Sequence, residues 1–356
     1  MKKSYENELT PEVREGLKKN LVYVGIFSVI MLFAGLTSAY YVSMSDTFWL
    51  ITPLPQAFFI STALIGISSL TFILAISFAK KLKLGMLKLF ISLTLLLGIG
   101  FVYFQFQGYK ALVASGVHVV NKNILVNDGR YGDYFTLKYK GNHLEVDGNN
   151  YYLEGKIANE SQMKAISDFS AQFTDASRKG GLKDIQNYGK EIILLYNDEP
   201  VLFLDGKLQR ADGKIMEFLD LSRLSVFATH LKDGRGDFFV KGEIGKDFHI
   251  YFKGTELTYK DRSLYKGNQK LTAYLQNSAA SSPDTANSYM YMITFIHLLH
   301  IMVTLIFLIK TVTYSFQGKY TNGDTLGLRA TGIFWHFLGL LWLFLLLFLL
   351  FIHKLA

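Results

Sequence analysis

The stretch ATGIFWHFLGLLWLFLLLFLLFI, residues 330–352, contains no charged residue and decides the class of the fold. At roughly 20 residues per bilayer crossing, it is long enough for one transmembrane helix. It carries His336 directly after Trp335, with Trp342 further along the same run. An imidazole inside a span costs free energy in lipid, so we expect His336 to face protein or a polar cavity. The run therefore predicts a helix that does more than anchor the chain.

Four more apolar runs have the length of a span, and the composition agrees with a membrane protein. Half of the 356 residues are hydrophobic and 15% are aromatic, and the mean hydropathy is positive. The chain contains no cysteine, which excludes disulfides, thiolate metal sites and cysteine nucleophiles. The predicted spans are about Leu21–Met44, Ala57–Ala79, Leu84–Phe106, Tyr291–Val312 and Ala330–Ile352.

A polar stretch of about 180 residues separates the third and fourth spans, which is ample for a separate domain. We predict a fold class of an all-α transmembrane bundle of five helices with an inserted, mainly β (α+β) extracytoplasmic domain. The expected divisions are residues 1–112 for the N-terminal tail and three helices, 113–288 for the insert and its linker, and 289–356 for two helices.

Basic residues in the short loops predict the orientation. The loop of residues 45–56 has no lysine or arginine, and the C-terminal tail has only Lys354. Cytoplasmic loops carry the excess of basic residues, so we place the N-terminus in the cytoplasm of a bacterial inner membrane, with the insert and C-terminus in the periplasm. This bias also accounts for part of the net charge of +8 without nucleic-acid binding. The basic clusters are Lys2, Lys3, Arg14, Lys18 and Lys19, then Lys80, Lys81 and Lys83, then Lys310, Lys319 and Arg329.

Within the insert we expect mainly strands. Residues 134–139 and 248–252 alternate as half-buried strands do, and residues 192–196 and 201–204 are apolar runs joined by a turn composition. One helix is expected from Asn159 to Lys179, because Asn159 and Gln162 have the spacing of a capping box and two glycines follow. We interpret residues 277–288 as a linker to the membrane.

Two segments of the insert match in spacing. Residues 135–144, FTLKYKGNHL, and residues 248–257, FHIYFKGTEL, share the Phe, the Lys-Gly pair and the final Leu. Two β units of one kind, similar hairpins in one sheet, or chance would each explain ten such residues.

His297 and His300 lie three residues apart in the fourth span and therefore share a helix face. They could contribute to a metal or haem site, but such a site needs ligands from other helices, and His336 is the only other histidine well inside a span. The alternative, which we favour, is that the histidines hydrogen-bond across helices and stiffen the bundle. The spans contain no carboxylate, which argues against a proton path. We expect no catalytic, cofactor-binding or metal-binding residue in this chain.

Several segments together resemble subunit III of the haem–copper oxidases, the cytochrome c oxidase family. Trp335-His336-Phe337 with Trp342-Leu343-Phe344 looks like that family's WHFVDxxWLF, and the run from Thr294 to His300 resembles its TGxHxxH. Residues 31–35, MLFAG, resemble MFFAG, and Pro53-Leu54-Pro55 before a serine-rich span is similar to the corresponding family loop. The resemblance covers the five spans and is to the shorter, five-helix form, here with a large external insert.

The departures from the family pattern concern acidic and glycine positions. Val29, Arg329 and Gly339 stand where the family often has acidic residues, which puts a role in proton uptake in doubt. Phe295 and Leu298 replace two glycines of the histidine motif.

The resemblance implies a non-catalytic subunit of a respiratory terminal oxidase, which passes electrons from cytochrome c to oxygen in aerobic respiration. Haem and copper then belong to partner subunits I and II, and this chain stabilises subunit I and binds phospholipid. The residues implied for helix packing and lipid contacts are His297, His300, Trp335, His336, Trp342 and Arg329. We expect the insert to dock a second respiratory complex or a cytochrome c domain.

Two alternatives stay open from the sequence. The chain could be the equivalent subunit of a quinol oxidase or a nitric oxide reductase. From a different class, it could be a membrane-anchored sensor or assembly factor with an extracytoplasmic β domain, which explains the insert but not the histidine and tryptophan motifs together. No common catalytic motif occurs in the insert.

Overall fold

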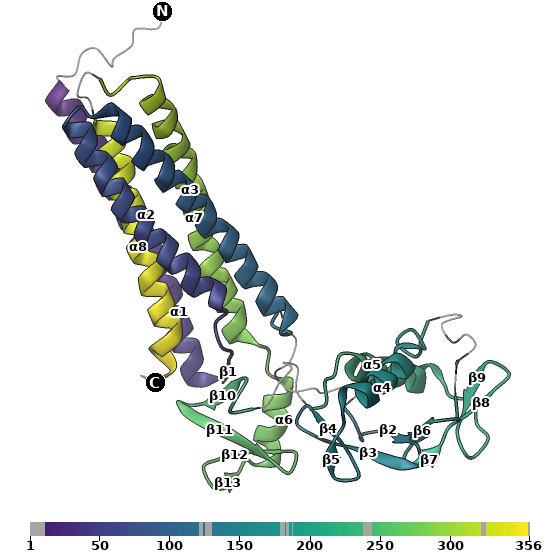
Figure 1. Cartoon of the computed structure of the whole chain (residues 1–356). Coiled ribbons are helices and arrows are strands. Elements are labelled where there is room, and N and C mark those ends of the chain that lie inside the picture. Colours follow the sequence, from purple (N-terminus) through teal and green to yellow (C-terminus); the bar gives the residue numbers. More distant parts are fainter. Residues whose placement is uncertain are drawn as a thin grey trace, which may run out of the picture. The chain divides into compact units, whose positions relative to one another are not determined.

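The computed structural model describes residues 11–120, 124, 130–178, 182, 185–186, 188–237, 244–321 and 325–354. These residues form two compact units, which are described separately (Figure 1). The membrane unit contains the chain up to Ser45, Leu54–Ala114 and the chain from Ser288 onward. The inserted unit contains Asp46–Pro53 and Ser115–Asn287. The chain therefore passes between the two units at four places.

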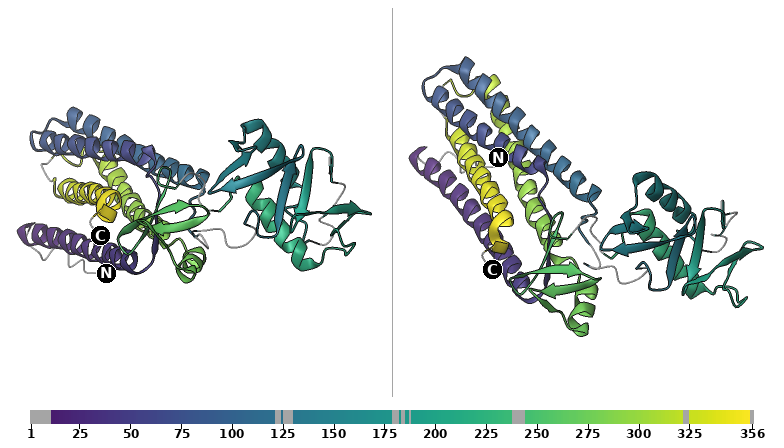
Figure 2. Two further views of the ribbon diagram at one scale, coloured as in Figure 1. Left: turned by 90° about the horizontal axis from the view of Figure 1, so that it is seen from below. Right: turned by 60° about the horizontal axis from the view of Figure 1, so that its bottom comes forward.

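Five long helices make up the membrane unit and run side by side in Figures 1 and 2. Each is long and apolar enough to cross a membrane, which confirms the five predicted spans. Most of the helices are longer than the predicted spans, because polar residues at their ends continue the helix beyond the apolar run. They are α1 (Pro11–Asp46), α2 (Gln56–Lys80), α3 (Leu84–Ala114), α7 (Thr285–Phe316) and α8 (Leu326–Phe351), followed by the short 3₁₀ helix η2 (Ile352–Lys354).

Glycines allow close approach of the helices at particular points. A Cβ atom on Gly98 of α3 would lie 2.7 Å from the Trp335 ring, and one on Gly108 would lie 2.2 Å from the Phe58 ring. Both rings are fully buried. Because only a hydrogen fits at these positions, α3 can lie directly against α2 and α8.

The inserted unit contains two larger sheets and one separate hairpin. The five-stranded sheet has the order β1-β10-β11-β12-β13, the six-stranded sheet has the order β5-β4-β3-β2-β6-β7, and β8 pairs with β9. The strands are β1 (Phe48–Ile51), β2 (Phe135–Tyr139), β3 (Asn142–Asp147), β4 (Asn150–Leu153), β5 (Lys156–Ile157), β6 (Ile192–Tyr196), β7 (Glu199–Pro200), β8 (Leu202–Leu204), β9 (Lys207–Gln209), β10 (His249–Phe252), β11 (Thr255–Lys260), β12 (Ser263–Lys266) and β13 (Gln269–Lys270).

Three helices complete the inserted unit: α4 (Glu160–Ala171), α5 (Phe218–Lys232) and α6 (Ala273–Ser281). The expected capping box of α4 is confirmed, since the Asn159 side chain accepts from the Gln162 backbone N–H and the Gln162 side chain accepts from the Asn159 N–H. The expected end at Lys179 is wrong. The α-helix ends at Ala171 and turns follow through residue 177, which still bury Phe173 in the core.

The expectation of a linker over residues 277–288 is also wrong. Most of that segment is helical, in α6 and the start of α7. The Thr272 hydroxyl caps α6 by accepting from Leu275 N–H, and Ala279 is buried. A Ser- and Ala-rich composition therefore forms a helix here because tertiary burial outweighs the sequence signal for a linker.

The same order of elements occurs three times in the inserted unit. Each copy begins with a glycine at positive φ whose N–H donates to the carbonyl three residues later: Gly132 to Phe135, Gly189 to Ile192 and Gly245 to Phe248. A strand, a two-residue turn, further short strands and a capped helix then follow. We name the copies repeat 1 (residues 131–171), repeat 2 (188–232) and repeat 3 (244–281). The two sequence segments that match in spacing are thus equivalent hairpins of repeats 1 and 3.

Repeats 1 and 2 pack against each other with approximate local twofold symmetry. Their first strands, β2 and β6, run antiparallel with Leu137 opposite Leu194, which are equivalent positions in the two repeats. Ser167 Oγ of α4 donates to the Lys232 carbonyl, and Ser225 Oγ of α5 donates to the Thr174 carbonyl, so the helix contacts are reciprocal as well. Apolar residues of both repeats form a common core that includes Phe135, Phe169, Leu194 and Phe227.

Repeat 3 has a different strand partner. Its first strand, β10, pairs antiparallel with β1, from the loop between α1 and α2, and Leu50 lies opposite Ile250. Trp49 and Leu50 of β1 are fully buried. β1 therefore occupies for repeat 3 the place that β2 and β6 fill for each other.

The strands at residues 192–196 and 201–204 do not form the simple hairpin suggested by their spacing. β6 pairs with β7, whereas Leu202–Leu204 pairs with β9 in a separate hairpin. Asn197 and Asp198 both adopt positive φ in the turn. Val201 N–H still donates to the Leu194 carbonyl of β6, and the residues after it pair with β9 instead.

Candidate functional site

The motif residues of three membrane helices meet inside the membrane unit. His297 of α7 is completely buried, and its ring centroid lies 6.3 Å from that of Phe33 in α1 and 5.3 Å from that of Trp342 in α8. Phe101 of α3 closes the group at 6.1 Å from His297. The structure thus brings together the MLFAG, histidine and tryptophan segments in one aromatic cluster.

Directed hydrogen bonds fix the orientation of this cluster. The His297 Nε2–H donates to the Leu338 carbonyl of α8 over 3.0 Å. Trp335 Nε1 donates to Ser68 Oγ over 3.0 Å, and Trp342 Nε1 donates to Thr62 Oγ1 over 2.8 Å. Both hydroxyls belong to α2, so these bonds tie α8 to α2 and to α7. In a lipid environment such bonds contribute about 1 kcal/mol each to helix association.

The sequence predicted the histidines and tryptophans but missed their partners. Ser68 and Thr62 lie among many small residues of the second span, and nothing in their spacing distinguishes them from packing residues. Each also donates its own proton to a carbonyl in the same helix, Ser68 to Ile65 and Thr62 to Phe58. Their oxygens are therefore oriented as acceptors for the indoles.

The other predicted residues lie around this cluster. His300 Nδ1 donates to the Ile296 carbonyl one turn earlier, and its ring lies 5.9 Å from Phe33. His336 is half-buried with its ring centroid 5.9 Å from that of Phe72. Arg329 is half-buried in the first turn of α8. His336 and Arg329 thus lie outside the hydrogen-bonded group.

The arrangement in the membrane unit is suited to holding helices together. In the described part of the chain, no three His, Asp or Glu side chains gather as metal ligands. The His297 nitrogen that faces α8 is already engaged by a carbonyl. Each polar contact described above connects either two helices or two successive turns of one helix. None of these contacts presents a group to a substrate.

A groove of about 610 Å³ lies between α1 and α8. Ala34 and Ser38 of α1 line this groove and are exposed within the chain. The opposite wall is formed by Phe337, Leu340 and Phe344. A groove of this size with apolar walls suits an acyl chain better than a polar ligand.

A buried ionic cluster connects repeat 3 to the start of repeat 1 and to the segment that follows repeat 2. Asp237 is almost completely buried, and its carboxylate accepts from Arg130, Arg262 and the Tyr259 hydroxyl. The Arg262 guanidinium also donates to the Tyr131 carbonyl. Burial, and then the charge of Asp237, raise the pKa of Tyr259 above its usual range, so this hydroxyl stays protonated as a donor.

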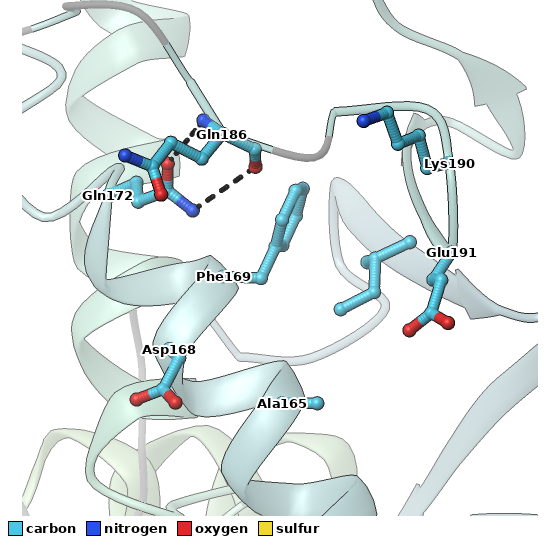
Figure 3. Close-up of a pocket in the computed structure, with 8 residues that line it drawn as sticks. Ala165, Asp168, Phe169, Gln172, Gln186, Lys190 and Glu191 are labelled. Atoms are coloured by element: carbon cyan, nitrogen blue, oxygen red, sulfur yellow. Dashed lines mark hydrogen bonds between the residues drawn. The ribbon is translucent and has the colours of Figure 1, made fainter.

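The inserted unit also has a hollow, which lies between α4 and the turn before β6 and has a volume of about 800 Å³ (Figure 3). Phe169 and Ile192 provide apolar surface, while the carboxylates of Asp168 and Glu191 and the ammonium of Lys190 lie at its rim. At the place related by the local twofold, between α5 and the turn before β2, the Arg223 guanidinium stacks over the Tyr134 ring, 4.0 Å from its centroid. The opposite charges around the open hollow do not select an anion or a cation.

Comparison with known proteins gives one family match. The model described as cytochrome c oxidase subunit III matches residues 246–353, which include repeat 3 from β10 onward, α7 and α8. The match covers under a third of the chain and begins after repeats 1 and 2. No curated protein and no solved structure matches the sequence.

Proposed function

We propose, because residues 246–353 match the model of the cytochrome c oxidase subunit III family, that the chain is a non-catalytic membrane subunit of a haem–copper terminal oxidase. In this proposal haem and copper reside in subunits I and II, and electrons pass from cytochrome c to oxygen in a complex embedded in a bacterial inner membrane. One observation carries the proposal: the matched region contains the histidine and tryptophan side chains that tie α7 and α8 to each other and to α2.

The proposed role of these side chains is to keep the helices in a fixed arrangement for packing against subunit I. A hydrogen bond from an indole or imidazole is directional, so it sets the rotation of α8 about its axis as well as its position. His297, Trp335 and Trp342 have this role, and His300, His336 and Arg329 would contribute packing and lipid contacts at the edge of the cluster.

We assign lipid binding to the groove between α1 and α8. The change Ala34→Phe would fill this groove, whereas Ala63→Phe adds the same bulk to the exposed face of α2. We expect Ala34→Phe to lower the amount of phospholipid retained after purification in mild detergent, measured by mass spectrometry. Ala63→Phe should retain the amount found with the unaltered chain. Equal retention by both variants would remove the lipid site from this groove.

The decisive experiment for the subunit assignment is purification from native membranes in mild detergent, followed by an absorption spectrum. An oxidase subunit should bring haem-containing partners, with reduced-minus-oxidised bands of haem in the purified complex. A sensor or assembly factor, the alternative class, would purify without haem. Recovery of the folded chain alone under several mild detergents would contradict the proposal.

Repeats 1 and 2 lie outside the family match, and we propose that they dock a second respiratory complex or a cytochrome c domain on the periplasmic side. Replacing residues 131–237 by a short Gly/Ser linker leaves repeat 3 and its strand partner β1 in the chain. We expect the oxidase spectrum to stay unchanged while co-purification of the second complex is lost. Unchanged co-purification would show that docking does not need these repeats.

A further inference from the structure

The three repeats provide an internal comparison of their exposed surfaces. The second turn of each repeat joins β3 to β4, β8 to β9 or β11 to β12. The residue directly before it is Asp147 in repeat 1, Leu204 in repeat 2 and Lys260 in repeat 3, and all three are exposed. Two positions earlier the residues are Glu145, Leu202 and Thr258, which are also exposed. The same solvent-facing positions are therefore polar in two repeats and apolar only in repeat 2.

Further apolar residues of repeat 2 adjoin these leucines. Leu202 pairs with Gln209, which in turn pairs with Ile215, so Leu202 and Ile215 lie on one face of the hairpin. The first turn of α5 follows directly with two more exposed apolar side chains. We name these five residues the repeat-2 patch: Leu202, Leu204, Ile215, Phe218 and Leu219, which are 47%, 50%, 51%, 73% and 58% exposed. Repeats 1 and 3 each have one large exposed apolar residue in the corresponding region, Ile157 and Tyr274.

The composition of the patch favours lipid over a protein partner. Protein-binding hot spots are enriched in Trp, Tyr and Arg and poor in Leu, whereas Leu and Phe are typical of side chains that enter the membrane interface. The repeat-2 patch contains three Leu, one Ile and one Phe. The inserted unit is also tethered to the bilayer, because the chain passes from it into four of the five candidate membrane helices, α1, α2, α3 and α7.

The charges around the patch indicate which lipid it needs. Asp205 and Lys207 flank the β8–β9 turn, and Asp212 and Lys214 form an ion pair at 3.8 Å beside Ile215. Arg210 pairs with Asp220, and Glu217 directly precedes Phe218. The surroundings therefore have no excess of basic groups, so attraction to anionic headgroups does not contribute. Burial of the apolar side chains alone would hold the patch on a zwitterionic bilayer.

We propose that the repeat-2 patch docks the inserted unit on the lipid bilayer by placing Leu202, Leu204 and Phe218 at the boundary between headgroups and acyl chains. Repeats 1 and 2 share one core, so contact at repeat 2 also restrains repeat 1 at the membrane surface. This contact is independent of the oxidase assignment and requires only that the chain be embedded in a membrane.

The full chain can test this directly, because it has no cysteine of its own. Leu204→Cys, labelled with a nitroxide and reconstituted into phosphatidylcholine vesicles, reports the surroundings of the patch by electron paramagnetic resonance. Oxygen concentrates in the bilayer and a nickel chelate stays in water, so their collision rates with the label distinguish the two phases. We expect the label at 204 to collide more with oxygen than with nickel, at a depth of about 5–10 Å. Added anionic lipid should not change this result.

The matched controls are Asp147→Cys and Lys260→Cys, at the equivalent positions of repeats 1 and 3, where the nickel chelate should dominate. Nickel access at 204 equal to that of the controls would overturn the proposal. Protection from both reagents would also overturn it, because that pattern indicates a protein contact with a partner or a second copy. Dependence of the protection on anionic lipid would contradict the apolar mechanism.

A second measurement does not rely on a label at position 204. Leu202→Glu with Leu204→Asp gives repeat 2 the residues that repeat 1 already carries, so the fold should be kept, which circular dichroism checks. With a nitroxide at Phe218→Cys, this double change should move the label from the oxygen-accessible to the nickel-accessible phase. A label that stays in the oxygen-accessible phase would show that the leucines do not hold the patch on the membrane.

Discussion

Gly98 offers the sharpest test of how the membrane helices pack. A methyl group at this position of α3 would lie 2.7 Å from Cη2 of Trp335 and 2.9 Å from Cδ2 of Leu305. Trp335 is completely buried and its indole is held by Ser68, so the ring cannot move aside without losing that hydrogen bond. We therefore expect Gly98→Ala to destabilise the bundle.

The magnitude follows from two opposing contributions. Alanine in place of a helical glycine stabilises by about 0.5–1 kcal/mol through reduced backbone entropy in the unfolded state. Overpacking of a filled core costs about 1–3 kcal/mol. The control Gly66→Ala in α2 has the first contribution only, because a Cβ atom there meets nothing within 4 Å. Gly98→Ala should thus be less stable than Gly66→Ala by about 1–3 kcal/mol.

The free energy of unfolding can be measured by equilibrium titration with sodium dodecyl sulfate in mixed micelles. With Trp49 of the inserted unit replaced by Phe in every variant, tryptophan fluorescence comes only from Trp335 and Trp342 of the cluster, and circular dichroism follows the helices. If Gly98→Ala were as stable as Gly66→Ala, the close contact between α3 and Trp335 would be refuted. A spectral shift of Trp335 without a loss of stability would mean that the ring has room to move.

Three further changes test the other contacts. Trp342→Phe removes the hydrogen bond to Thr62, and the same titration should show a loss of about 1–2 kcal/mol; no loss would mean that this bond does not tie α8 to α2. Asp237→Asn leaves two arginines, each about 30% exposed, in contact with a neutral group. Thermal unfolding of the inserted unit should therefore show a loss of about 1–3 kcal/mol in the free energy of unfolding. The control Asp212→Asn, at an exposed position, should change that free energy by less than about 0.5 kcal/mol. The raised pKa of Tyr259 means that the folded state holds the phenolic proton more tightly than the unfolded chain. The contribution of Tyr259 to stability is therefore constant below about pH 10 and falls above it. Tyr259→Phe should make the fall in stability at high pH less steep in pH-dependent melting curves.

The sequence was sufficient for the five spans because each is a long run whose composition alone selects a helix in lipid. The capping box at Asn159 was also predictable, since its two partners are three residues apart. The end of α4 and the helix α6 were mispredicted, because their bounds depend on burial of Phe173 and Ala279 by distant parts of the chain. Short-range signals decide where such a helix starts better than where it ends.

The threefold repeat was only partly visible in the sequence. The Lys-Gly turns of repeats 1 and 3 match, but repeat 2 has Asn197-Asp198 at that place, and both residue pairs can adopt positive φ. Different residues thus satisfy the same backbone requirement, which hides the relation in a comparison of letters.

The sequence by itself determined that this chain has five apolar helices, an inserted α+β domain and a histidine–tryptophan pattern of the subunit III type. It did so because apolar length, capping and turn chemistry act over a few residues. Only the tertiary structure decided that Trp335 and Trp342 bond to hydroxyls of α2, that β1 pairs with a strand about 200 residues later, and that repeat 2 alone exposes an apolar face. The physical reason is that partners far apart in the chain are selected by the shape and polarity of the folded surroundings, which no local pattern records.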